Sequence, residues 1–198
     1  NLRYRVYFKY MEKEQLEIMR HSCAHLIAAA VFELYPEAKF GVGPVVENGF
    51  YYDIKFPGDF GEDKLKEIEK IAIKLKNKNL PFVRKEMDID EAIKYFADKG
   101  QEFKVSLLQD LKEKGTTKMN AEELQDVGGD VNKVSVYTTG NFVDLCRGPH
   151  VESSAQIGSF KLTRLAGAYW RGDEKNAMLT RIYGVCFATE KELDEYLK

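Results

Sequence analysis

Residues 12–35 show the spacing of one long helix without a break. His21 and His25 lie one turn apart on one side of it, with apolar side chains at neighbouring helical positions. Pro36 ends the pattern, because the residue before a proline avoids the α region. The alanine run at 28–30 lets another element approach closely. We therefore expect a long N-terminal helix with further elements packed against it.

Turn chemistry marks the first strands after this helix. Asn48-Gly49 lies between Val45-Val46 and Phe50, which predicts a hairpin, because a type I′ turn needs positive φ at both central residues. Later patterns predict helices over 61–78, 89–100 and 190–198, and strands over 80–88, 102–108, 133–146, 158–172 and 179–189. Residues 110–132 carry little hydrophobic pattern and are predicted to be a surface excursion. Strands mixed with helices, without regular βαβ alternation, indicate an α+β fold with an antiparallel sheet.

Composition narrows the class of protein. The 198 residues are 44% hydrophobic, and 30 Lys+Arg against 32 Asp+Glu leave a formal charge of −2. That balance argues against a whole-surface polycation but allows a local basic patch for nucleic acid. Three cysteines indicate reduced thiols, and Cys23 and Cys186 have apolar neighbours that favour core packing. The chain has no apolar run of roughly 18 residues and no secretion signal, so we expect a cytoplasmic protein without a membrane partner.

The three histidines fall in two pairs with the same spacing. His21 and His25 are four residues apart in HSCAH, and Cys146 and His150 are four apart in DLCRGPH. Three imidazoles and a thiolate form an acceptable zinc set, although Ser22 occupies the position of the zincin glutamate. An isolated pair of this kind is more often a packed helix face than a site. Because every histidine belongs to one of the two pairs, we favour a single shared site.

Longer motifs surround these pairs. In chain order they are RHSCAHL, FGVGPVVENGFYYD, FKVS, DLCRGPHV and FKL, followed by AGAYWRGD and RIYG. This series closely resembles the editing domain of bacterial-type threonyl-tRNA synthetases over roughly residues 15–198. The resemblance implies an α+β fold of the threonyl/alanyl-tRNA synthetase second-additional-domain type. Residues 1–14 form a segment of uncertain origin, and residues 110–132 look longer than is usual in the family.

The resemblance implies hydrolytic editing of Ser-tRNA(Thr). Threonine and serine differ by one methyl, which a pocket distinguishes by only about 1–3 kcal/mol, so mischarged serine must be removed at a second site. The implied partners are tRNA(Thr) carrying serine and the synthetase catalytic core, in cis or in trans. The motifs of that core are missing from this sequence, so we expect an excised domain or a free-standing editing protein. No cofactor is implied.

The resemblance also assigns roles to individual residues. His21 and Lys104 would hold and activate the hydrolytic water. The implied substrate-binding residues are His25, Tyr52, Asp144, Cys146 and His150. Without the resemblance, Lys104 would be an ordinary exposed strand lysine.

Two alternatives remain beside this hypothesis. The first is a zinc-dependent editing protein of the alanyl type, with His21, His25, Cys146 and His150 as ligands. The second is a module that docks tRNA without activity. We favour a metal-free site, because Lys104 supplies positive charge that zinc would otherwise provide.

A basic and aromatic stretch near the C-terminus suits RNA. Phosphates and a stacked base are the features of tRNA that such a mixture recognises. The candidate tRNA-binding residues are Arg164, Tyr169, Trp170 and Arg171. The alternative is a strand with ordinary surface charge and a core aromatic.

Overall fold

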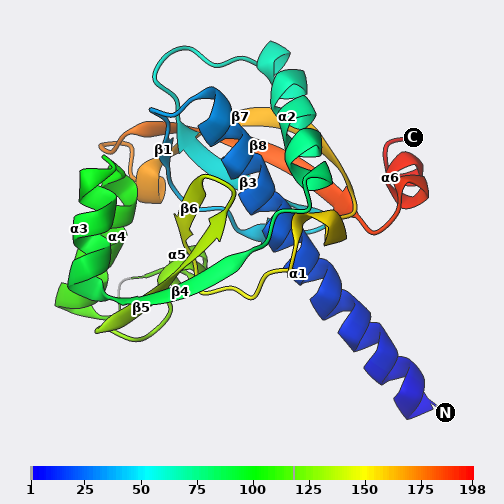
Figure 1. Cartoon of the computed structure of the whole chain (residues 1–198), viewed down its shortest axis with the longest axis horizontal. Coiled ribbons are helices and arrows are strands. Elements are labelled where there is room, and N and C mark those ends of the chain that lie inside the picture. The colour runs from blue at the N-terminus through cyan, green and yellow to red at the C-terminus, as the bar shows by residue number, and fades with distance from the viewer. Residues whose placement is uncertain (1, 118) are drawn as a thin grey trace.

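The computed structural model describes residues 2–117 and 119–198, with side chains described from Lys13 onward. Helix α1 (Leu2–Leu34) begins well before the predicted start at Glu12 and ends where Pro36 requires. Its residues 21–31 are buried on all sides, and the alanines at 28–30 are at most 5% exposed. A helix that is apolar all round belongs inside the fold. Figure 1 shows the C-terminal half of α1 inside the molecule and its N-terminal end projecting away from it.

Two antiparallel sheets flank the buried part of α1. The larger comprises β1 (Lys39–Phe40), β2 (Val45–Val46), β3 (Gly49–Lys55), β7 (Ser159–Tyr169) and β8 (Met178–Phe187). Its order is β1-β3-β8-β7, with β2 paired to β3. The smaller sheet comprises β4 (Val83–Asp88), β5 (Lys133–Thr139) and β6 (Phe142–Leu145), in that order. The predicted α+β class with antiparallel pairing is confirmed.

The remaining helices lie at separate places around the sheets (Figure 1). They are α2 (Leu65–Asn77), α3 (Ile89–Asp98), α4 (Glu102–Lys114), α5 (Ala121–Val127) and α6 (Glu190–Tyr196), with 3-10 turns at Glu62–Lys64, Ser154–Gln156 and Trp170–Gly172. One core lies between α1, α2 and the larger sheet and contains Cys23 and Cys186, as predicted. A second core lies between α3, α4 and the smaller sheet. None of the described helices combines the length and the apolar character that crossing a bilayer requires.

The predicted hairpin forms, but its turn is displaced by one residue. Val46 pairs with Gly49, so the two loop residues are Glu47 and Asn48, and Asn48 has a φ of 61°. Gly49 already belongs to β3. A Cβ there would meet the Gly184 carbonyl oxygen of β8 at 1.9 Å, so glycine is required for close strand approach.

Two predictions in the middle of the chain are wrong. Residues 102–108 form the start of α4 instead of a strand, because Phe103, Leu107 and Leu111 recur at helical spacing and are all buried. Residues 110–132 are not only a surface excursion, since they include the end of α4 and the whole of α5. Helix α5 buries Glu123 and Asp126, so its buried face is largely polar and gives no hydrophobic pattern.

Candidate functional site

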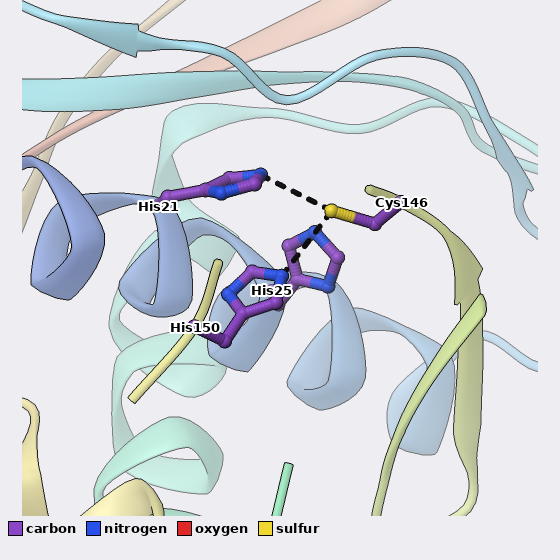
Figure 2. Close-up of side chains that lie close together, drawn as sticks. All are labelled: His21, His25, Cys146 and His150. Carbon is purple, nitrogen blue, oxygen red and sulfur yellow. Dashed lines mark hydrogen bonds between the residues drawn. The ribbon is translucent and has the colours of Figure 1, made fainter. Parts of the chain in front are cut away.

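The structure brings the two spaced pairs together. His21 and His25 come from α1, and Cys146 and His150 come from the loop that follows β6 (Figure 2). One donor atom from each of the four residues lies within 4.8 Å of the others. The three imidazole rings are 4.2–5.1 Å apart between centroids. We call these four residues the histidine–cysteine cluster.

The loop after β6 owes its path to backbone contacts. Cys146 N donates to Ser135 O at 3.1 Å, and Ser135 Oγ donates back to Cys146 O at 2.7 Å. Gly148 then turns the chain with a φ of 81°. A Cβ at Gly148 would meet the Tyr137 hydroxyl at 2.4 Å, so only glycine fits. This turn directs His150 back toward Cys146.

The cluster is joined by contacts among its own members and by Ser22. Cys146 Sγ lies 3.5 Å from His21 Nε2 and 3.3 Å from His150 Nε2. Ser22 Oγ donates to the Ile18 carbonyl at 2.8 Å and lies 3.0 Å from His150 Nδ1. Because that hydroxyl proton is already used, Nδ1 of His150 is the donor, which leaves its Nε2 as an acceptor facing the thiol. Ser22, missed as a functional residue from the sequence, thus sets the tautomer of His150.

A second group of polar side chains centres on Asp144. Its Oδ2 accepts from the Tyr52 hydroxyl at 2.5 Å and lies 3.5 Å from His25 Nε2. Its Oδ1 lies 2.8 Å from Lys104 Nζ, which also donates to Gly41 O at 2.6 Å. Nδ1 of His25 is buried and has no hydrogen-bond partner among the described residues. Asp144 therefore connects Lys104 to the histidine–cysteine cluster.

Lys104 occupies a different environment from the one that its local sequence suggests. It lies on α4 and is 1% exposed, so the exposed strand lysine is ruled out. Burial by itself would lower the pKa of Lys104, but the charges of Asp144 and Asp126 raise it above its ordinary value. The lysine is charged, and its charge is balanced by carboxylates. It therefore does not supply the uncompensated positive charge that we expected to replace a zinc ion.

Burial makes the cluster neutral near pH 7. It lowers the pKa of His21 to about 4, although a hydrogen bond to the Pro149 backbone and the charge of Asp144 act in the opposite direction. Burial also lowers the pKa of His25 and of His150, and the neighbouring rings lower both further. The pKa of the Cys146 thiol is raised by burial. The site thus presents neutral imidazoles, which accept protons, beside a thiol.

A cavity reaches the Asp144–Lys104 pair. Its volume is about 190 Å³, and aromatic side chains supply much of its remaining wall, among them Phe40, Phe96 and Phe142. Space of this size matches a small polar group more closely than a large ligand. The cavity thus borders the buried pair, whose two residues are 1% and 2% exposed.

The four candidate tRNA-binding residues have different environments. The Arg164 guanidinium is exposed and stacks 3.7 Å above the Tyr183 ring centre, and Tyr169 is 41% exposed. Trp170 is buried and its ring lies 4.9 Å from that of Phe103, so its side chain packs in the core. Arg171 is engaged in ion pairs with Asp110 and Glu123.

Comparisons with known proteins agree with these motifs. Residues 134–183 match the family described as "Threonyl and Alanyl tRNA synthetase second additional domain". The chain is 46% identical over 186 residues, 94% of its length, to the threonine--tRNA ligase of Francisella philomiragia, and equally to that of Francisella tularensis subsp. novicida. It spans 27% and 26% of those two proteins, so about a quarter of each. The resemblance drawn from the motifs is thereby confirmed: along nearly its whole length the chain is similar to segments of threonine--tRNA ligases, and residues 134–183 match the second-additional-domain family.

Proposed function

We propose that this chain hydrolyses the ester that joins serine to the terminal ribose of mischarged tRNA(Thr). The observation that carries the proposal is the meeting of the neutral histidine–cysteine cluster with the buried Asp144–Lys104 pair. Ester hydrolysis needs a positioned water and a group that takes its proton. A neutral imidazole suits that role, because it accepts a proton and then returns it.

His21 is the proposed general base. It accepts a proton from water as the water oxygen forms a bond to the seryl carbonyl carbon. When the bond from that carbon to the ribose oxygen breaks, the imidazolium returns the proton to the departing oxygen. Serine and tRNA with a free terminal hydroxyl are the products, and His21 is again neutral.

The remaining residues hold the substrate. The free Nδ1 of His25 is available to the serine amine or hydroxyl, and Tyr52 and Asp144 present further polar atoms beside it. Lys104 is too enclosed to approach the ester, so its proposed role in activating the water is exerted through Asp144. The crowding of three rings and a thiol leaves little space for the extra methyl of threonine.

The zinc alternative rests on the same cluster. His21, His25, Cys146 and His150 match zinc ligands in kind and number, and bound zinc would supply a Lewis acid. We retain the metal-free proposal on the family resemblance, since the contacts of His25 with Asp144 and of His150 with Ser22 suit a metal-free site and a zinc site equally.

One assay separates the candidates. The chain is incubated with Ser-tRNA(Thr), Thr-tRNA(Thr) and Ser-tRNA(Ala), each with and without a chelator. We expect rapid loss of serine from tRNA(Thr) alone, unaffected by chelation. Loss that stops on chelation would favour the zinc enzyme, and loss from Ser-tRNA(Ala) would favour the alanyl type. Binding of tRNA without deacylation would favour the alternative of a module that docks tRNA without activity.

A further inference from the structure

Asp126 is a buried acid without a role in the mechanism above. It lies on α5, in the segment that the sequence predicted to be a surface excursion, and is 5% exposed. Its Oδ2 is 3.4 Å from Lys104 Nζ. This ion pair stabilises the buried carboxyl group, because burial of an acid is unfavourable unless it is paired.

The helix that carries Asp126 is anchored at its start. Asn120 caps α5 by accepting from Glu123 N at 2.8 Å, and the Glu123 carboxylate accepts from Asn120 N at 3.2 Å. The other Glu123 oxygen lies 2.7 Å from Arg171 Nε, on the turn between β7 and β8. Asp126 follows Glu123 by three residues and so lies on the same side of the helix. These contacts fix the approach of Asp126 to Lys104.

The lysine ammonium has three N–H groups and four neighbouring acceptors. Gly41 O accepts a hydrogen bond at 2.6 Å, and Asp144 Oδ1 lies 2.8 Å away as an ion-pair partner without hydrogen-bond geometry. Asp126 Oδ2 and the Tyr52 hydroxyl each accept a longer hydrogen bond, both at 3.4 Å. Asp126 thus both pairs with the ammonium and accepts a hydrogen bond from it.

We propose that Asp126 is a positioning residue that holds the Lys104 ammonium against Asp144. The inference rests on the deacylation proposed above, to which it adds a residue from outside the matched motifs. Asp126 acts through Lys104 and touches neither the ester nor the water.

The charges around Asp126 make its effect depend on pH. Burial raises the pKa of Asp126 to about 7, against the attraction of Lys104. The titratable groups that face it are Lys104 on α4, Asp144 on β6, Cys146 after β6, Tyr52 on β3 and Glu123 on its own helix. The ionised carboxylate is the stronger acceptor. The hold on Lys104 therefore strengthens as the pH rises through about 7.

The test compares Asp126→Asn with Glu122→Gln, which removes one acid from the same helix without a contact to Lys104. For Asp126→Asn we expect kcat for Ser-tRNA(Thr) to fall about tenfold at pH 8 with KM unchanged. We also expect the rise of kcat through about pH 7 in the unsubstituted chain to be absent from this variant. Glu122→Gln should keep both the rate and the rise.

An unchanged kcat and pH profile in Asp126→Asn would overturn this inference and leave the proposed function intact. No deacylation by the unsubstituted chain would overturn the proposed function itself. Carbon-13 NMR of the unsubstituted chain gives a readout that needs neither activity nor a folded variant. The Asp126 carboxyl should titrate near pH 7, and titration near pH 4 would contradict the predicted dependence of its hold on pH.

Discussion

Asp144 and Lys104 form a buried ion pair, with Asp144 Oδ1 2.8 Å from Lys104 Nζ, and this pair joins two parts of the fold. Asp144 lies on β6 of the smaller sheet, whereas Lys104 lies on α4. The second oxygen of Asp144 faces His25 on α1, 3.5 Å away. A change at the lysine is therefore transmitted to the histidine–cysteine cluster through one carboxylate.

Replacing Lys104 by methionine should destabilise the fold strongly. The substitution leaves Asp144 and Asp126 as buried carboxylates without a cation. Removing one partner of a buried pair typically costs about 3–5 kcal/mol in the free energy of unfolding, which urea denaturation measures. Lys66→Met, at an exposed position of α2, is the control and should stay within about 0.5 kcal/mol. A loss below about 1 kcal/mol in Lys104→Met would contradict the buried pair.

Replacing His21 by alanine should affect chemistry far more than binding. General base catalysis contributes about 10²–10⁴-fold, so the rate of Ser-tRNA(Thr) deacylation should fall by that order. Affinity for the same tRNA, measured by filter binding, should remain within about twofold, because His21 is 3% exposed and lies inside the site. Equal losses in rate and affinity would show that His21 anchors RNA.

Ser22→Ala tests the tautomer of His150. The variant removes the hydroxyl that faces His150 Nδ1 and that accepts from Val151 N at 3.0 Å. The His150 ring is then no longer held in one tautomer. We expect kcat to fall about tenfold with tRNA affinity retained. Ser106→Ala, on α4, is the matched control. Equal deacylation rates in the two variants would show that Ser22 has no role in the site.

The sequence predicted those elements whose burial is apolar. Periodic hydrophobic residues predicted helix α1 and strands β7 and β8. The turn residues predicted the hairpin at Asn48. The histidine–cysteine cluster was also predictable. Its two pairs have the same spacing and contain every histidine of the chain, which indicated one shared site. The strand predicted over 102–108 was wrong, because the helical stripe there is completed only by Leu111, beyond the segment assigned to a strand.

The polar interior was beyond the reach of such patterns. Helix α5 buries Glu123 and Asp126, whose partners Arg171 and Lys104 lie 48 and 22 residues away in the sequence, as the residue numbers show. No local pattern relates residues so far apart, since they meet only when the two cores are assembled. For the same reason Lys104 was assigned to the surface from its neighbours alone.

Arg164 and Trp170 should respond in opposite ways to alanine. Arg164 is exposed over Tyr183, so its loss should weaken tRNA binding and reduce the salt dependence of binding by about one unit of slope. Trp170 packs on Phe103, so its loss should cost about 3–5 kcal/mol of stability. Binding across a salt series and urea denaturation measure the two effects. A stable Trp170→Ala variant that binds tRNA poorly would restore Trp170 as an RNA contact.

Acidification should destabilise the metal-free fold before most carboxylates titrate. The pKa of His21 falls to about 4 in the folded chain, and those of His25 and His150 are also lowered, whereas an unfolded imidazole titrates at about 6.5. The unfolded state therefore binds more protons, and stability is lost as the pH falls from about 6.5 toward 4. Asp126, with its pKa raised to about 7, and Asp53, whose pKa burial also raises, act the other way, but two acids oppose three imidazoles.

Urea denaturation of chelator-treated protein between pH 7.5 and 5 measures this loss. The variant His150→Phe has one imidazole fewer and should show a shallower fall in the denaturation midpoint. A midpoint that rises on acidification would mean that the imidazoles are already protonated in the folded chain, and His21 could not then serve as the base.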